Sequence, residues 1–163
     1  MAHGLVNVAA STGRDNVWTA QPDSWDTMMA VNTRAPFFLI QGLAGLLRDA
    51  GESGSMVNIG SVSGHGGQPF ILSYCVSKGA LATMTKNVAY SLMRHGVRVN
   101  QVNPGWVLTE NEIARKRQQG LDDDWPGRVG PQFAPSGRLI APEEIAAAAK
   151  AHRPSRPAVR RRS

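Results

Sequence analysis

Three short runs of apolar and β-branched residues predict buried β-strands. They are Gly4–Val8, Ser55–Ile59 and Val97–Val102, and small or polar residues follow each of them. Longer stretches, in which apolar residues recur at helical spacing, separate the three runs. The order strand, helix, strand, helix, strand predicts a parallel sheet with crossover helices, and therefore an α/β architecture.

The clearest predicted helix runs from about Ser73 to Arg94. This segment contains no proline, and Gly96 follows at a position suited to end a helix. Its apolar residues recur every three or four positions and define one face: Leu81, Met84, Val88 and Leu92. This stripe can face the core of its own domain or pair with another subunit, and the core is the commoner arrangement.

The remaining segments are predicted to form weaker helices and loops. A helix begins at Pro22–Ser24 and extends towards Leu47, with a kink or a new turn at Pro36. Pro142 suits the first turn of a final short helix. Residues 110–119 are compatible with a polar helix, whereas residues 11–21 and the Gly/Pro-rich residues 120–138 are predicted to be loops.

Positive charge is concentrated at one end of the chain. The 163 residues have a formal net charge of +6, and residues 150–163 hold six lysines and arginines and no acid. Residues 1–149 are left with 12 basic and 12 acidic residues and are neutral. We therefore predict one domain over residues 1–149 and a disordered basic tail over residues 150–163. The tail has no aromatic residue for base stacking, which argues against a nucleic-acid partner.

The cysteine content and the apolar stretches indicate a cytoplasmic protein. Cys75 is the only cysteine, which excludes a disulfide framework and a cysteine-based metal site. The longest apolar stretch, Ala35–Leu47, has 13 residues and contains Gln41, so it is too short to span a bilayer. No charged segment followed by an apolar one opens the chain, and no secretory signal is expected.

Polar residues and glycines gather where the predicted strands end. The three segments are Asn7–Ala10, Gly60–Gly64 and Asn103–Gly105. In a parallel sheet, ligands bind beyond the carboxyl ends of the strands. The sequence therefore predicts a ligand site at this edge of the sheet.

Tyr74 and Lys78 could carry chemistry at this edge, because they lie four residues apart at the start of the long helix. A nearby cation favours the phenolate and lowers the pKa of a tyrosine towards the range of efficient proton transfer. Ser61 lies thirteen residues before Tyr74 in a Gly/Ser turn, where a hydroxyl can bind a carbonyl oxygen. Taken singly, these residues and the helical Asn32 are more often structural.

Other polar residues are weaker candidates. Ser61 does not lie in a Gly-x-Ser-x-Gly elbow, which argues against a hydrolase nucleophile with His65 as its base. The remaining histidines lack metal-ligand spacing, and Asp122–Asp124 fit a solvated acidic loop. No metal site is expected.

As an ordered set, the candidate residues resemble the short-chain dehydrogenase/reductase family. The resemblance covers roughly residues 4–145 and includes the strand leading to Ser61 and the thirteen-residue gap to Tyr74. Tyr-x3-Lys pairs are common, but the full set is specific: Asn7-x-Ala9-Ala10, Asn32, Ser61, Tyr74-x3-Lys78 and Pro104-Gly105-x-Val107-x-Thr109.

The resemblance implies an enzyme that uses NAD or NADP to interconvert a carbonyl and an alcohol on a small-molecule substrate. Tyr74 would be the general acid/base, and Lys78 would lower its pKa and hold the nicotinamide ribose. Ser61 would polarise the carbonyl, and Asn32 would help to keep a water in a proton relay. The segments beside the cofactor would be formed by Asn7, Ala9, Pro104, Gly105, Val107 and Thr109.

Departures from the family's pattern change what is expected of this chain. The family's Asn-Asn-Ala-Gly is Asn7-Val8-Ala9-Ala10 here, which alters the cofactor wall. The expected fold is a Rossmann-like parallel sheet with flanking helices. It lacks the first βαβαβ part of the family's fold and the Gly-x-x-x-Gly-x-Gly turn, which binds the pyrophosphate of the cofactor. Gly64–Gly67 is the nearest glycine cluster, at the wrong place in the order. We expect a truncated or mis-started chain with an Arg/Pro-rich end, an uncovered sheet edge, poor NAD(P)H binding and little turnover.

Two other functions stay open from the sequence. A non-catalytic remnant could dock onto a related subunit through the helices carrying Asn32 and Tyr74, which build a dimer interface in the family, and the same helices could form a homo-oligomer. A nucleic-acid binder ranks last. Residues 106–138 take the place of the family's substrate-covering loop, and Trp106, Trp125 and Phe133 either line an apolar substrate or pack this segment onto the body.

Overall fold

The three predicted strands lie parallel in the order β1-β2-β3. In the computed structural model, which describes residues 2–152, β1 spans Gly4–Asn7, β2 spans Gly54–Ile59 and β3 spans Val97–Val102. The register places Asn7 beside Asn58 and Asn58 beside Gln101. The predicted α/β architecture is therefore confirmed.

Helices connect the strands and continue after the last one. The path from β1 to β2 contains α1 (Pro22–Met29), a π-helical turn (Ala30–Arg34) and α2 (Ala35–Ala50). The path from β2 to β3 contains short 3-10 turns at Val62–His65 and Pro69–Ile71, then α3 (Leu72–Leu92) and a 3-10 turn at Met93–His95. After β3 come α4 (Glu110–Gln118), α5 (Trp125–Phe133) and α6 (Pro142–Ala151).

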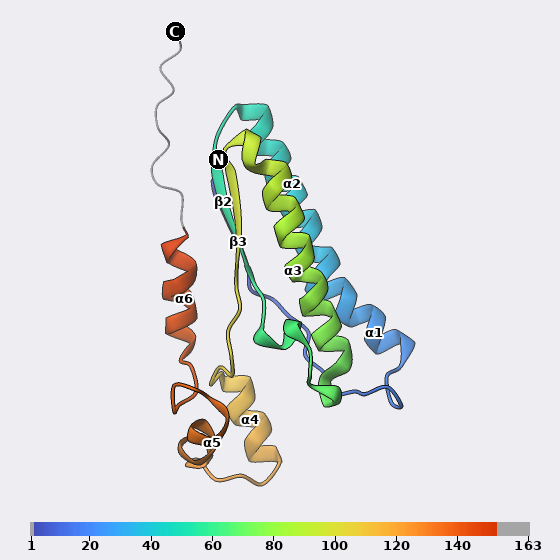
Figure 1. Ribbon diagram of the computed structural model, residues 1–163, viewed down its shortest axis with the longest axis vertical. Helices are drawn as coiled ribbons and strands as arrows, with labels where there is room; N and C mark the ends of the chain where they lie inside the picture. The colour runs from blue at the N-terminus through green and yellow to red at the C-terminus, as the bar shows by residue number, and fades with distance from the viewer. Residues whose placement is uncertain (1, 153–163) are drawn as a thin grey trace.

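One face of the sheet, which we call the helix face, packs against α2 and α3 (Figure 1). The buried cluster on this face draws on α2, β2 and β3: Ile40, Leu47, Met56, Val97 and Val99. Leu81 of the α3 stripe is 2% exposed, and Met84, Val88 and Leu92 pack against the cluster. The stripe therefore faces the core of its own domain. Gly96 ends this region in the left-handed conformation, at φ +69°.

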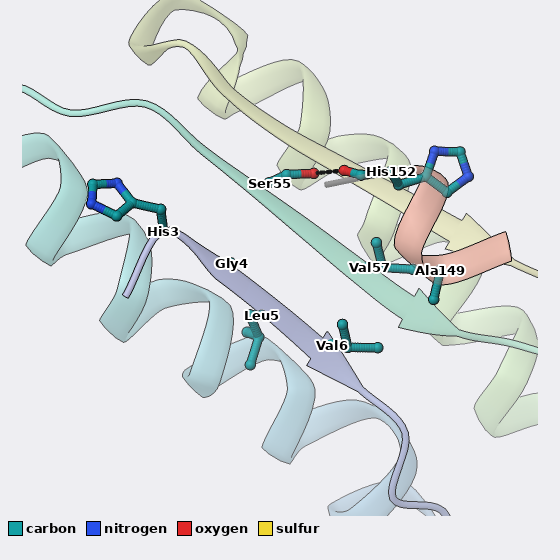
Figure 2. Close-up of a pocket in the computed structure, with 8 residues that line it drawn as sticks. All are labelled: His3, Gly4, Leu5, Val6, Ser55, Val57, Ala149 and His152. Atoms are coloured by element: carbon teal, nitrogen blue, oxygen red, sulfur yellow. Dashed lines mark hydrogen bonds between the residues drawn. The ribbon is translucent and has the colours of Figure 1, made fainter. Parts of the chain in front are cut away.

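The opposite face, which we call the α6 face, is less covered. Between β1, β2 and the end of α6 lies an open groove of about 330 Å³, lined by residues such as Val6, Val57 and Ala149 (Figure 2). Val6 is 47% exposed. Parallel sheets normally bury both faces, so this face is only partly covered at β1, whereas Val57 of β2 on the same face is 3% exposed.

The first long helix is interrupted before Pro36, as predicted, by the π-helical turn Ala30–Arg34. Pro36 has no N–H to donate to the carbonyl of Asn32, four residues earlier, so a regular α-helical hydrogen bond cannot form there. The N–H of Ala35 instead donates to the carbonyl of Ala30, five residues back. The wider turn places Asn32 in the interior at 1% exposure.

The prediction of a loop over residues 120–138 is wrong, because Trp125–Phe133 forms α5. The Gly and Pro content suggested irregular structure, but Pro126 occupies the first turn, where its missing N–H is harmless. Trp125 is 1% exposed and packs against Trp106, with ring centroids 5.7 Å apart. Tertiary packing of one large side chain thus outweighs the local preference.

The remaining predictions concern two short helices, membrane-spanning segments and the basic tail. The polar helix over residues 110–119 and the helix begun by Pro142 are present as α4 and α6. No helix among residues 2–152 combines the length and apolarity needed to cross a bilayer. Most of the predicted basic tail, residues 153–163, lies outside the described residues.

Candidate active site

The three strand ends meet as predicted. The N–H of Gly60 donates to the carbonyl of Val102 at 2.8 Å, and the N–H of Val62 donates to the carbonyl of Pro104 at 3.0 Å. These bonds tie the turn that contains Ser61 to the end of β3. At the other side, Asn7 Nδ2 donates to Asn58 Oδ1 at 2.8 Å and ties the end of β1 to β2.

Ser61, Tyr74 and Lys78 come together at this edge. Ser61 Oγ accepts the N–H of Ser63 at 3.1 Å, and its hydroxyl lies close enough to Tyr74 to lower the pKa of that phenol. Lys78 Nζ lies 5.7 Å from the centroid of the Tyr74 ring and donates to the carbonyl of Ile59 at 2.7 Å. The spacing in the sequence therefore translates into one cluster of two hydroxyls and an amine.

Gly64 lets the turn after Ser61 pack closely on α3. A Cβ at Gly64 would lie 3.0 Å from the carbonyl carbon and oxygen of Lys78 and 3.2 Å from the N–H nitrogen of Gly79. A side chain would push the turn away from the helix. This glycine therefore serves helix packing.

Burial sets the pKa values of this cluster. Burial raises the pKa of Tyr74 above its ordinary 10.0, although the hydrogen bond with Ser61 acts in the opposite direction. Burial also lowers the pKa of Lys78 from 10.5 to about 8. Burial is thus the largest influence on the pKa of Tyr74, and the effect of Lys78 on this pKa stays a prediction. Tyr74 keeps its proton at neutral pH and can donate it.

Asn32 is fully engaged by protein groups. Its Oδ1 accepts the N–H of Ser11 at 2.7 Å, and its Nδ2 donates to the carbonyl of Ser11 and to Ser77 Oγ, both at 2.9 Å. Ser77 Oγ in turn donates to the carbonyl of Tyr74 at 2.8 Å. The side chain of Asn32 thus links the loop after β1 to the first turns of α3. A proton relay would have to use the backbone carbonyl of Asn32, which Pro36 cannot pair.

Asp15 is a positioning residue that the sequence did not reveal. Its Oδ1 accepts the N–H of Ser73 at 2.9 Å, its Oδ2 accepts the Ser73 hydroxyl, and its backbone carbonyl accepts the N–H of Leu72 at 3.2 Å. A carboxylate at this place caps the N-terminus of α3 and opposes the positive end of the helix dipole. The cap is directly beside Tyr74. A polar loop without periodicity carries no signal for such a contact.

The remaining predicted cofactor residues shape the segment around the strand ends. Val107 forms a parallel bridge with Ile140, and the Thr109 hydroxyl accepts the N–H of Glu112 at 3.2 Å and caps α4. Gly105 lies beside Ile140, and Ala9 is exposed at the edge. Their roles towards a cofactor stay predictions.

The aromatic residues after β3 mainly pack this segment together. Besides its contact with Trp125, Trp106 lies 6.3 Å from the Phe133 ring, and Lys116 Nζ lies 5.5 Å from the Trp106 ring. Phe133 itself is 71% exposed. Asp122 and Asp123 form exposed ion pairs with arginines at 2.8 Å, and residues 2–152 contain no group of three or more His, Cys, Asp or Glu placed to hold a metal.

The arrangement is suited to a reaction at a carbonyl oxygen. Two hydroxyl groups, from Ser61 and Tyr74, are adjacent at the strand ends and can both donate to one oxygen. Lys78 supplies an amine beside the phenol. A proton donor, a second hydrogen-bond donor and a cation define the class of site that protonates a substrate oxygen.

Comparison with known proteins identifies the family. A family model described as enoyl-(acyl carrier protein) reductase matches residues 1–151. The chain belongs to the short-chain dehydrogenase/reductase family, as its residues suggested.

Individual relatives are similar over most of this chain. One is the inactive 2-(S)-hydroxypropyl-CoM dehydrogenase 2 of Xanthobacter autotrophicus, which is 36% identical over 90% of this chain and 63% of the relative. Another is 2-(S)-hydroxypropyl-CoM dehydrogenase 3 of the same organism, 38% identical over 89% of this chain and 56% of the relative. The chain thus spans about 60% of the length of these curated relatives.

Solved structures confirm the Rossmann-like fold. A putative 2-deoxy-D-gluconate 3-dehydrogenase from Agrobacterium tumefaciens with bound NADP matches with a TM-score of 0.82 and 32% identity, over 93% of this chain and 59% of that one. L-sorbose reductase from Gluconobacter frateurii, complexed with NADPH and L-sorbose, matches with a TM-score of 0.83 and 26% identity, over 90% of this chain and 57% of that one.

Proposed function

We propose that this chain carries the catalytic residues of an NAD(P)-dependent oxidoreductase that interconverts a carbonyl and an alcohol on a small molecule. The observation that supports this function is the cluster at the strand ends, where the Ser61 hydroxyl lies close enough to Tyr74 to act on its pKa and Lys78 Nζ lies 5.7 Å from the Tyr74 ring. The family membership supplies the reaction class, and the geometry supplies the residues.

In the direction of reduction, Tyr74 is the general acid. Its O–H donates the proton to the substrate oxygen, and Ser61 donates a hydrogen bond to the same oxygen as charge develops there. Lys78, charged below its pKa of about 8, stabilises the phenolate that Tyr74 becomes. In the reverse direction the Tyr74 phenolate takes the proton from the alcohol. The nicotinamide cofactor, when bound, supplies or accepts the hydride.

The residues present fit the nicotinamide end of such a cofactor. Lys78 Nζ has three N–H bonds, and the carbonyl of Ile59 accepts one of them at 2.7 Å, so donors are left for ribose hydroxyls. Tyr74 lies beside Lys78. The wall of the cofactor site would be formed by Asn7, Ala9, Pro104, Gly105, Val107 and Thr109.

A matched pair of tyrosine variants tests this function. Tyr74→Phe removes the proposed acid, whereas Tyr90→Phe removes the other tyrosine, which is 79% exposed on α3. Turnover is measured on the full chain at millimolar NADH and NADPH with ketones, 3-oxoacyl thioesters and keto-sugars. We expect Tyr74→Phe to reduce kcat at least about 100-fold and Tyr90→Phe to leave it unchanged. Equal rates in the two variants would contradict the proposal, and no turnover by the unmodified chain would favour the non-catalytic module.

A homo-oligomer through α1 and α2 is a second proposal. It is supported by the exposed apolar side chains of α2, among them Phe38 at 57% and Leu46 at 60%. The α3 stripe takes no part, because it faces the core. Sedimentation velocity on the full chain should show an oligomer that Leu46→Asp dissociates, and a monomer at all concentrations would refute this proposal.

A further inference from the structure

A row of polar side chains crosses the helix face of the sheet directly below the site. Asn7 Nδ2 donates to Asn58 Oδ1, Asn58 Nδ2 donates to Thr85 Oγ1, and Thr85 Oγ1 donates to Gln101 Oε1, each at 2.8 Å. Gln101 Nε2 then donates to Asn103 Oδ1 at 2.6 Å. Each amide donates to the next member, and Gln101 Oε1 is one of two acceptors for the Thr85 hydroxyl, so the row connects β1 to the end of β3.

Three members of the polar row are buried in the core, where apolar side chains are the usual choice. Asn58 is 0% exposed, Thr85 5% and Asn7 8%. Such groups destabilise a core unless every one is hydrogen-bonded. Asn7, Asn58 and Gln101 are also register partners on adjacent strands. A slip of one residue would separate all of these bonds, so the row selects one register.

The row lies immediately before the catalytic segments. Ile59 follows Asn58, and its carbonyl accepts Lys78 Nζ at 2.7 Å. Gly60 comes next, and a Cβ there would overlap Asn103 Oδ1 and Gln101 Nε2. Asn103 thus lies against the residue that precedes Ser61, and a shift of the row would move the turn that holds this serine.

We propose that the polar row sets the position of Ser61 and of Pro104–Gly105 relative to Tyr74, and that Thr85 and Gln101 are positioning residues of the site. This inference rests on the proposed function, which assigns the site to this edge. Thr85 connects the two halves of the row. Its hydroxyl oxygen accepts a hydrogen bond from Asn58, and its one proton has two acceptors, the carbonyl of Leu81 at 2.7 Å and Gln101 Oε1 at 2.8 Å. Removing its hydroxyl would take one hydrogen bond from the buried Asn58 amide and one from the half-buried Gln101 amide.

The test uses NMR spectra of the full chain. Thr85→Val keeps the side-chain shape and removes the hydroxyl, Thr85→Ser retains the hydroxyl, and Thr83→Val is the control on the exposed side of the same helix. We expect Thr85→Val to move the backbone amide signals of Ser61 and Gly105, while Thr85→Ser and Thr83→Val leave them in place. Reduced nicotinamide mononucleotide should bind to Thr85→Val roughly fivefold more weakly, the effect of one lost hydrogen bond of about 1 kcal/mol.

A second variant keeps the test decisive if Thr85→Val does not fold. Gln101 is half-buried, and Gln101→Met interrupts the same row nearer to its end. This variant should move the amide signals of Ser61 and Gly105 as well. The proposal is overturned if a folded variant melts at a lower temperature yet leaves the Ser61 and Gly105 signals unmoved. If the signals move but the unmodified chain binds no mononucleotide, the positioning role stands and the proposed function fails.

Discussion

The two faces of the sheet differ in how deeply their side chains are buried and in the hydrogen bonds they make near the candidate site. On the helix face, Met56 is 0% exposed, and Asn58 and Lys78 are buried with hydrogen bonds to other elements. On the α6 face, Val6 is 47% exposed beside the open groove of Figure 2. Ser61, Tyr74 and Lys78 depend on α3 and the strand ends. The candidate site is therefore held by contacts of the helix face and of the strand ends.

The largest expected effect is the loss of core packing on the helix face. Met56→Ala removes a fully buried side chain from the cluster beneath α2 and α3. We expect the free energy of unfolding to fall by about 2–5 kcal/mol, as for other large-to-small core substitutions. Urea denaturation measures it, with Met93→Ala, at a methionine that is 68% exposed, as the control. A loss of the same size at Met93 would contradict the packing described.

The second effect concerns pH and Lys78. Since burial lowers the pKa of Lys78 to about 8 from 10.5, the folded state releases this proton before the unfolded state does as the pH rises. The free energy of unfolding should therefore increase between about pH 8 and pH 10, by an amount on the order of 2 kcal/mol from this residue. The raised pKa of Tyr74 acts in the opposite direction above pH 10.

Lys78→Met isolates this contribution. The difference between the urea-derived stabilities of the two proteins should change with pH over this window, in favour of the unmodified chain at the higher pH. A difference that is constant from pH 8 to pH 10 would mean that Lys78 is more solvated than its contacts indicate.

A smaller effect is expected from the cap of α3. Asp15→Ala leaves the N–H of Ser73 without its carboxylate and should lower the free energy of unfolding by about 1 kcal/mol. Hydrogen exchange at Ser73 should also accelerate. Asp23→Ala, in the exposed first turn of α1, is the matched control. The cap is refuted if both variants lose the same stability and the Ser73 amide exchanges as before.

The smallest effect is expected on the α6 face. Val6→Ala should lower the free energy of unfolding by less than about 0.5 kcal/mol, because this side chain already lies half in solvent. The measurement is the same urea titration. A loss as large as that of Met56→Ala would show that the α6 face is packed in solution, and the contrast between the two faces would disappear.

The elements that the sequence predicted are those with a strong local pattern. The strands at residues 54–59 and 97–102 and the helix that carries Tyr74 follow from runs and stripes of apolar residues. The ordered candidate set also brought Ser61, Tyr74 and Lys78 together correctly. Helix α5 could not be predicted, because its glycines and prolines dominate the local signal while the burial of Trp125 is decided by the distant Trp106.

The burial of a side chain and its contacts with residues far away in the sequence cannot be predicted from the spacing of residues along the chain. The four-residue spacing places Lys78 near Tyr74, but only the fold shows that burial raises the pKa of Tyr74. Asp15 and Ser73 are 58 residues apart, and Asn7 and Asn58 are 51 apart. Nothing near either partner in the chain indicates the other.

The central claim is that the strand ends of this chain form the nicotinamide end of a dehydrogenase site. The most direct measurement is a pair of NMR titrations of the full chain, one with reduced nicotinamide mononucleotide and one with AMP. We predict that the mononucleotide shifts the amide signals of Ser61, Tyr74 and Gly105 at millimolar concentration and that AMP leaves them unchanged. Shifts with AMP alone, or with neither compound, would contradict the account.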